Sequence, residues 1–212
     1  MAGHAIVLDL TDRACVVAGG GPEAARRVAA LLEAGARVTV VAPALCPELA
    51  ERASRGEVRH VPREFRPEDL DGAWLAYVTE APEELLPEIA REASERRVFL
   101  NVFDRPEFGS FSSPAILRRG DLLLAASTGG KSPLLARKIR ERWEREFGPE
   151  YAALLRLLGE IRARLRESGL DAARRKETLE RLLEGPLLEA LRAGDRQRVE
   201  EELRRAGAAP VP

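Results

Sequence analysis

The feature that most constrains this chain is a glycine run, Gly19-Gly20-Gly21-Pro22-Glu23-Ala24, set between an apolar run and an amphipathic pattern. Residues 14–18 predict a buried strand, and residues 22–34 predict a helix that ends at Gly35. In a strand–GxGxxA–helix unit, the glycines allow a tight turn and a close approach of the backbone to a phosphate. The small third residue lets the helix pack closely on the strand. The pattern predicts a dinucleotide-binding turn, although a glycine turn that serves packing alone remains an alternative.

Strand and helix patterns alternate through the rest of the first half. Four more strands are predicted at residues 37–41, 58–61, 74–78 and 98–102, with helices at residues 47–54 and 85–94 between them. Strands that alternate with helices form a parallel sheet with right-handed crossovers. The predicted fold class is therefore α/β, with a Rossmann-type parallel sheet over residues 1–113.

The alternation of strand and helix patterns ends at about residue 108. Residues 110–113 are extended and polar, residues 122–127 predict a strand, and residues 133–147 predict a charged amphipathic helix. This small α+β segment, residues 114–150, is too small to form a core of its own, so we expect it to dimerise by burying its apolar faces against a second copy. Residues 151–212 predict a C-terminal helical domain with breaks at Gly169, Gly185-Pro186 and Gly194-Asp195.

Charge and cysteine content narrow the classes of partner. Lys plus Arg is 34 and Asp plus Glu is 35, a balance that argues against a nucleic-acid partner. Cys15 and Cys46 belong to no CxxC or Cys/His array, so no metal site is predicted. The N-terminus lacks the pattern of a secretory signal, and no apolar stretch approaches the roughly 18 residues of a membrane span. We therefore expect a cytoplasmic protein with no membrane partner.

Candidate site residues follow from the expected sheet order, in which the first, fourth and fifth strands are neighbours and ligands bind beyond their carboxyl ends. Those ends carry Gly19–Gly21, Thr79–Glu80 and Asn101–Asp104, with Val102 included. Asp104 falls where a nicotinamide ring is expected and is a candidate base. An ordinary aspartate in an Asp-Arg-Pro turn is the structural alternative.

Two further segments, residues 42–44 and 127–133, are candidates for contact with a ligand. The second strand is followed by Ala42-Pro43-Ala44 and has no acid for the adenine ribose, which leaves backbone or Arg26 to contact it and leaves NAD and NADP both open. Residues 127–133 (STGGKSP) form a glycine-rich polar turn before a helix. This turn fits an anion site built from backbone N–H groups and Lys131, and it fits a plain N-capping turn equally well.

Taken together, these segments resemble one family. The residues that carry the resemblance are Leu10 to Gly21, Arg26-Arg27, Ala34-Gly35-Ala36, Val38 to Pro43, Asn101 to Pro106, Phe111, Pro114, Ser127 to Gly130, Ser132 to Arg137, and Arg174-Arg175 through Leu182 to Pro186. In this order and spacing they resemble precorrin-2 dehydrogenase, the N-terminal part of siroheme synthase.

The resemblance implies a Rossmann domain, a dimerisation segment and a helical domain, assembled as an intertwined homodimer. It implies NAD-dependent oxidation of precorrin-2, a tetrapyrrole, to sirohydrochlorin. In some members ferrous iron is a further substrate and is inserted to give siroheme. The family's catalytic aspartate falls on Asp104, and its NAD contacts fall on Pro22-Glu23 and Pro43-Ala44.

Basic residues are expected to bind the substrate, and the segment after the fourth strand differs from the family's sequence. Precorrin-2 is rich in carboxylates, and the expected substrate-binding residues are Arg105, Arg118, Arg119, Ser127, Thr128, Gly129, Lys131 and Arg137. A solvated charged face is their alternative. The family's Ala-Thr-Asp-Asp run and following asparagine are replaced by Thr79-Glu80-Ala81-Pro82 and Leu86. This departure keeps open a non-catalytic sensor that binds NAD or tetrapyrrole, and a protein that acts only as a chelatase.

Overall fold

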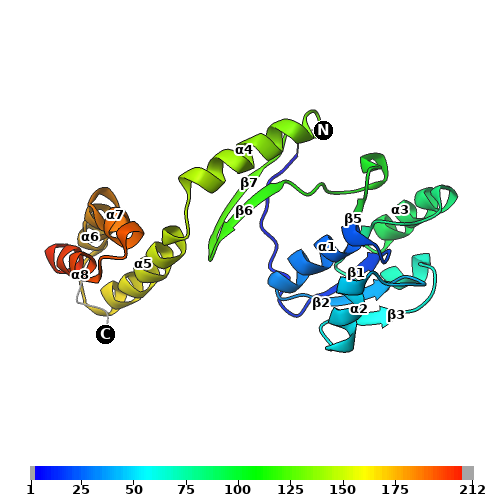
Figure 1. The fold of residues 1–212 in the computed structure, drawn as a ribbon, viewed down its shortest axis with the longest axis horizontal. Helices are drawn as coiled ribbons and strands as arrows, with labels where there is room; N and C mark the ends of the chain where they lie inside the picture. The colour runs from blue at the N-terminus through cyan, green and yellow to red at the C-terminus, as the bar shows by residue number, and fades with distance from the viewer. Residues whose placement is uncertain (1–2, 207–212) are drawn as a thin grey trace. The chain divides into compact units, whose positions relative to one another are not determined.

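The computed structural model describes residues 3–206, which form two compact units that divide between Ser113 and Pro114 (Figure 1). The first unit is built on five parallel strands in the order β3-β2-β1-β4-β5. The strands are β1 (Ala14–Ala18), β2 (Arg37–Val41), β3 (Arg59–Val61), β4 (Leu75–Val78) and β5 (Phe99–Val102). This is the predicted Rossmann-type sheet, and its third, fourth and fifth strands each begin one residue later than expected.

Helices cover both faces of this sheet because its strands are apolar on both sides. The helices are α1 (Pro22–Glu33), α2 (Pro47–Ser54) and α3 (Leu86–Glu95), with short 3-10 turns η1 (Pro67–Leu70), η2 (Glu83–Leu85) and η3 (Pro106–Phe108). Val17 and Val40 pack with Val28 of α1 and Leu49 of α2 on one face. Val16 and Val78 lie in the cluster that contains Ile89 of α3, on the other face.

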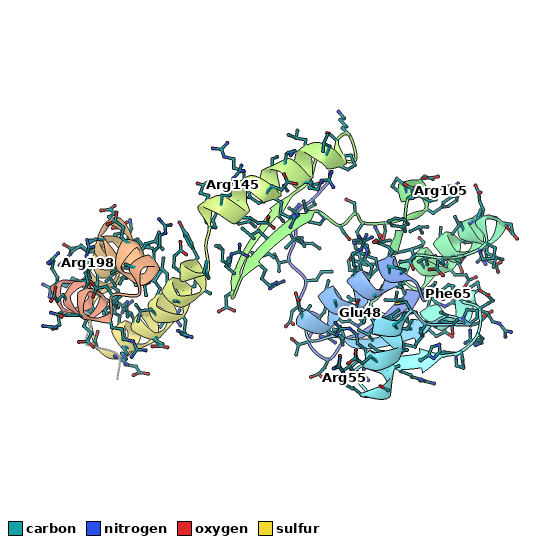
Figure 2. All side chains as sticks on the ribbon, viewed as in Figure 1. Glu48, Arg55, Phe65, Arg105, Arg145 and Arg198 are labelled. Carbon is teal, nitrogen blue, oxygen red and sulfur yellow. The ribbon has the colours of Figure 1, made fainter. Side chains whose placement is uncertain are left out.

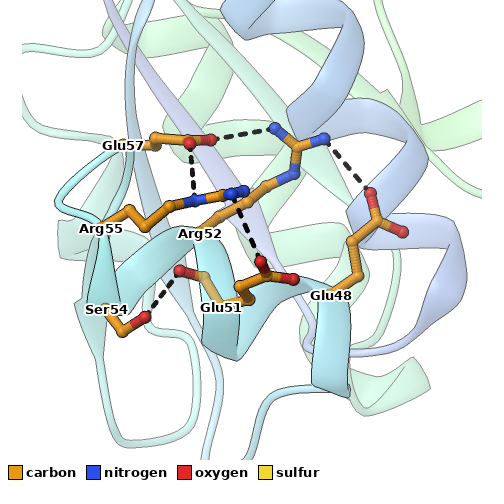
Figure 3. A network of polar contacts seen from close by, with 6 residues as sticks. All are labelled: Glu48, Glu51, Arg52, Ser54, Arg55 and Glu57. Carbon is orange, nitrogen blue, oxygen red and sulfur yellow. Dashed lines mark hydrogen bonds and ion pairs between the residues drawn. The ribbon is translucent and has the colours of Figure 1, made fainter.

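Two arginines, on α2 and directly after it, form ion pairs with neighbouring glutamates. Arg52 pairs with Glu48 at 3.3 Å and with Glu57 at 3.0 Å, while Arg55 pairs with Glu51 at 3.3 Å and with Glu57 at 2.9 Å. Figure 3 shows this network together with Ser54, whose hydroxyl donates to the Glu51 carbonyl. Exposed pairs of this kind each contribute roughly 0–1 kcal/mol. Arg52 and Arg55 are therefore matched by acids and do not form a basic patch.

The second unit begins with a hairpin and a helix. Strands β6 (Ala115–Arg119) and β7 (Leu122–Ala126) pair antiparallel and are followed by α4 (Pro133–Glu146). β7 and α4 agree with the expected elements, but β6 was not predicted. Its sequence, AILRR, ends in two arginines and lacks a clear apolar alternation. The turn that closes the hairpin contains Gly120 with φ +56°, in the left-handed region.

Four helices complete the second unit and have their own core. They are α5 (Glu150–Glu167), α6 (Ala172–Glu184), α7 (Leu187–Ala193) and α8 (Arg196–Arg205), and they end near the three predicted breaks. Ile161, Leu182, Leu187 and Leu203 are each at most 2% exposed and lie in one cluster. Asp171 and Asp195 cap α6 and α8, each through a side-chain oxygen that accepts a backbone N–H.

Candidate functional site

The glycine run forms the turn between β1 and α1, at the carboxyl edge of the sheet. Gly19 has φ +112°, and a Cβ atom there would lie 2.3 Å from Oγ1 of Thr79. A Cβ atom at Gly20 would lie 1.8 Å from the backbone oxygen of Ala44. The N–H of Cys46 also donates to the Gly20 carbonyl at 2.8 Å. Close packing against the ends of β4 and β2 therefore requires glycine at both positions, whether or not a ligand binds.

Gly21 is different, because no backbone outside the turn crowds it. It precedes α1 with φ −84°, and the only group within 4 Å of a Cβ built there is the Glu80 carboxylate, whose Oε1 lies at 2.6 Å. The first N–H groups of a helix have no partner within the helix. Gly21 therefore leaves space in front of the helix N-terminus that a side chain would fill. This is the cradle that a phosphate group needs.

The other expected cofactor residues surround this turn. Pro43 and Ala44 are exposed in the loop after β2, and no acid accompanies them. Ala24 is fully buried on the α1 side of the sheet. Glu23 pairs with Arg26 and, at 2.6 Å, with Arg27, so its charge is compensated within the first turns of α1. Val102 is 4% exposed and its side chain lies in the core, so only its backbone reaches the edge of the sheet.

The segment after β4 is fixed against the end of β1. Both the N–H and the hydroxyl of Thr79 donate to the Ala18 carbonyl at 2.8 Å. Glu80 follows, and its Oε1 accepts the Gly21 N–H at 3.1 Å. The structure thus brings Thr79 and Glu80 to the glycine turn, as the predicted strand order requires. The contact of Glu80 with Gly21 was not predicted from the sequence, because it depends on a side-chain rotamer.

Asp104 lies in the turn after β5, where its side chain is exposed. Its backbone is left-handed, with φ +58°, a conformation that aspartate and asparagine adopt more readily than most residues. The N–H of Phe103 donates to the Val78 carbonyl at 2.8 Å and holds the start of this turn beside β4. Asn101 serves a structural role, because its amide donates to the Phe111 carbonyl at 2.9 Å.

Arg105, the next residue, is labelled in Figure 2 and forms ion pairs with two acids. It pairs with Glu107 at 2.7 Å and with Glu83, and its guanidinium lies 5.2 Å from the centre of the Phe108 ring. Hydrogen bonds to Glu107 and then Glu83 raise the pKa of Arg105 and so stabilise its charged form. These two carboxylates compensate the charge that was expected to meet the substrate.

The candidate substrate residues of the second unit fall into two groups. In the turn at residues 127–132, the Gly129 N–H donates to Ser127 Oγ at 3.2 Å and the Ser132 N–H donates to Thr128 Oγ1 at 3.1 Å. Ser132 Oγ caps α4 by accepting the Leu135 N–H at 3.2 Å. Lys131 is exposed in this turn, and Arg137 follows about one helical turn into α4, where it pairs weakly with Glu141 at 4.0 Å. These residues form the first group.

Arg118 and Arg119 form the second group, at the other end of the hairpin. Arg119 pairs with Leu122 in the strand register, whereas Ala126, which leads into the 127–132 turn, pairs with Ala115. Four residues of strand separate the two ends, which is about 13 Å. Arg119 also donates to the Phe147 carbonyl at 2.9 Å, a bond that holds β6 at the end of α4. The structure does not bring the two groups of basic residues together.

Two further findings concern metal-binding clusters and membrane-spanning helices among the described residues. Across residues 3–206, no group of three or more His, Cys, Asp or Glu side chains is arranged to hold a metal ion. In the same range, no helix combines the length and the apolar character that crossing a membrane requires. The candidate site at the carboxyl edge of the sheet consists of the glycine backbone, Thr79, Glu80 and Asp104.

Comparisons with known proteins place all parts of the chain in one context. Residues 6–115 match the family described as "Putative NAD(P)-binding". Residues 119–146 match the sirohaem biosynthesis protein central region, and residues 150–206 match the sirohaem synthase dimerisation region. The description of a dimerisation region thus falls on the helical segment.

Individual relatives agree with these matches. The siroheme synthase of Thioalkalivibrio sulfidiphilus is 40% identical over 201 residues, which are 95% of this chain and 41% of that protein. The siroheme synthase of Chromobacterium violaceum is 38% identical over 204 residues, which are 96% of this chain and 43% of that protein. The chain therefore spans about two fifths of the length of these relatives.

A solved structure matches nearly the whole chain. It is SirC, a precorrin-2 dehydrogenase, with a TM-score of 0.78 and 26% sequence identity over 97% of this chain and 99% of that one. The fold of the chain is therefore shared with that structure over nearly its whole length. From these matches we conclude that the chain belongs to the family described as putative NAD(P)-binding, and that it is a homologue of the N-terminal part of siroheme synthase.

Proposed function

We propose that the chain catalyses the NAD-dependent oxidation of precorrin-2 to sirohydrochlorin. The observation that carries this proposal is the likeness to SirC, precorrin-2 dehydrogenase, which covers 99% of that protein. The siroheme synthases extend well beyond the matched region, whereas SirC does not. The activity named for that structure is therefore the one we propose for the matched region.

The glycine turn is the proposed cofactor site. The pyrophosphate of NAD fits the cradle at Gly21 and the free N–H groups of the first turn of α1, and Gly19 and Gly20 hold that turn in shape. The further cofactor contacts we propose are Pro22, Glu23, Ala24, Pro43, Ala44, Thr79 and the backbone of Val102, and the Glu80 carboxylate lies at the same turn, on the Gly21 N–H. When bound, NAD supplies the hydride acceptor for the oxidation.

Asp104 is the proposed base. Loss of hydride from the macrocycle must be accompanied by loss of a proton, and we assign the acceptance of this proton to the carboxylate that follows β5. Neither Phe103 nor Arg105, its neighbours, is a plausible alternative proton acceptor. The exposed position of Asp104 leaves its oxygens free for a substrate, since they accept no hydrogen bond from residues 3–113.

The substrate carboxylates call for basic partners. We propose Lys131 and Arg137, with the turn residues Ser127, Thr128 and Gly129, as the first of these, because Lys131 has no acidic partner within residues 114–149 and Arg137 has only a long contact to Glu141. Arg118 and Arg119 form a second, separate group. Arg105 is the weakest member of the set, because Glu83 and Glu107 already compensate it.

Anaerobic incubation with precorrin-2 and NAD tests the proposal. We expect NADH and sirohydrochlorin to appear together in absorbance, with NADP tested in parallel to identify the preferred cofactor. Addition of ferrous iron in a second stage tests for siroheme formation. Binding of NAD and tetrapyrrole without turnover would instead indicate a non-catalytic sensor. Siroheme formation from sirohydrochlorin, without NAD binding, would indicate a chelatase.

We also propose a homodimer whose contact includes the hairpin and α4. Between residues 114 and 149, all of which are described, only Leu117 and Ala136 are buried. Ile116, Leu134 and Leu135 are 44%, 57% and 52% exposed. Apolar side chains this exposed gain free energy when a second copy covers them. The helical segment, in contrast, already has a core of its own.

Light scattering at micromolar concentration should therefore report a dimer. Leu134→Glu combined with Leu135→Glu should convert it to a monomer, because charges cannot be buried in an apolar contact without a partner. Leu183→Glu is the matched control, since Leu183 is also 57% exposed but lies on α6. If only the Leu183 variant becomes monomeric, the contact belongs to the helical segment and our assignment is wrong.

A further inference from the structure

Glu80 places a carboxylate at the mouth of the glycine turn. Its Oε1 accepts the Gly21 N–H at 3.1 Å, and its Cβ and Cδ lie 3.1 Å and 3.2 Å from the position of a Cβ atom on Gly19. The side chain therefore extends along the turn from Gly19 to Gly21. Its charged end occupies the cradle in front of α1.

The backbone of Glu80 is fixed, but its side chain is free to leave. The preceding Thr79 is anchored to the Ala18 carbonyl by two hydrogen bonds of 2.8 Å, and the Glu80 N–H points at the same oxygen at 3.4 Å. The side chain itself is exposed. Rotation about its own bonds is thus enough to release the Gly21 N–H, with no change in the sheet.

The charge of Glu80 is not compensated by a neighbouring cation. Within residues 3–113, Glu80 forms no ion pair, whereas Glu23, the other acid at this turn, pairs with both Arg26 and Arg27. The only partner recorded for the Glu80 carboxylate in this unit is the Gly21 N–H. A carboxylate at a helix N-terminus is stabilised by the helix dipole in the way that a phosphate is. Glu80 therefore resembles the anion that the turn is built to bind.

We propose that Glu80 is a resident anion of the glycine turn, which the pyrophosphate of the cofactor must displace. This inference rests on the proposed function, in which that turn binds NAD. Because two like charges cannot share the cradle, Glu80 weakens the binding of every dinucleotide, oxidised or reduced. By the same effect it speeds the release of NADH after turnover, since affinity differences of this kind lie mostly in the dissociation rate.

Charge removal at constant shape provides the test. Glu80→Gln should bind NAD, measured by calorimetry, roughly tenfold more tightly than the wild type, and Glu80→Ala should do so as well. Glu84→Gln is the matched control: it removes the same charge from an exposed residue of η2 that does not approach the glycine turn. Its affinity for NAD should stay within about twofold of the wild type.

The kinetics of the Glu80→Gln variant should follow the affinity. KM for NAD should fall. If the chemical step limits turnover, kcat should stay unchanged, and if NADH release limits it, kcat should fall as well. In the absence of NAD, the NMR signal of the Gly21 amide should shift in Glu80→Gln and remain in place in Glu84→Gln.

The outcomes distinguish the inference from the proposed function. Wild-type binding of NAD with equal or weaker binding by Glu80→Gln would overturn the inference alone, and weaker binding would make Glu80 a ligand of the cofactor. No NAD binding by the wild type or by either Glu80 variant would overturn the proposed cofactor site and the inference with it. Binding by the variants alone would support both.

Discussion

Asp104→Asn is expected to lower the rate of precorrin-2 oxidation roughly hundredfold or more, with little change in thermal stability or NAD affinity. The amide keeps the size and shape of the side chain but cannot accept the proton. Asparagine also tolerates the left-handed backbone at this position, where φ is +58°. The loss of rate would therefore come from the chemistry and not from the turn. Single-turnover absorbance and a thermal midpoint, measured on the same samples, provide both values.

The structure supplies a matched control for this variant. Asp12 has φ +57° and lies in the turn before β1, and only its backbone carbonyl is bonded to another side chain, that of Arg37. Asp12→Asn is therefore the same substitution in the same conformation, and its turnover should equal that of the wild type. A normal rate in Asp104→Asn would show that Asp104 is only a turn residue.

Alanine is a less suitable replacement at Asp104. A left-handed conformation costs an ordinary L-residue about 1–2 kcal/mol. In a chain of this length a change of that order lowers the thermal midpoint by several degrees, about 2–4 °C for each kcal/mol. Asp104→Ala would therefore lose stability whether or not the carboxylate is catalytic. Comparison with Asp104→Gly, which removes the carboxylate without the strain, separates the two effects.

The sheet could be predicted from the sequence because its strands are short apolar runs bounded by glycine, proline or charged residues. Arg37–Val41 and Pro47–Ser54 have the predicted boundaries. β6 could not be predicted in this way, because Ile116 is exposed, Leu117 is buried and two arginines follow. Missing that strand also concealed the separation of Arg118 and Arg119 from the 127–132 turn, since the separation follows from the antiparallel register.

For the candidate site, the sequence predicted which residues lie at the same edge of the sheet, but not how they contact one another. Gly19, Thr79 and Asp104 were expected together, because the strand order of a parallel sheet places the ends of β1, β4 and β5 side by side. The contact between Glu80 and Gly21 and the left-handed backbone of Asp104 were not predictable. Both depend on three-dimensional details, a rotamer and a turn conformation, that have no periodic signal in the sequence.

Gly21→Val is expected to abolish NAD binding in a protein that remains folded. The backbone at Gly21 has φ −84°, which any residue adopts, and a Cβ atom there meets only the end of the flexible Glu80 side chain. Glu80 can rotate away, so the cost in stability is small. The valine side chain then fills the cradle in front of α1 and blocks the approach of the pyrophosphate to the N–H groups. Calorimetry should detect no binding, and Gly21→Ala should show an intermediate loss.

Gly20→Ala should lower both stability and NAD binding, so it cannot replace Gly21→Val as a test of the cofactor site. A Cβ atom at Gly20 would lie 1.8 Å from the backbone oxygen of Ala44, so the loop after β2 would have to move. Overpacking of this kind costs roughly 1–3 kcal/mol or more, and NAD binding would be lost together with the shape of the turn. Loss of binding with an unchanged thermal midpoint is the expected signature of Gly21→Val alone. Unchanged affinity in folded Gly21→Val would show that the glycine turn serves packing and does not bind the cofactor.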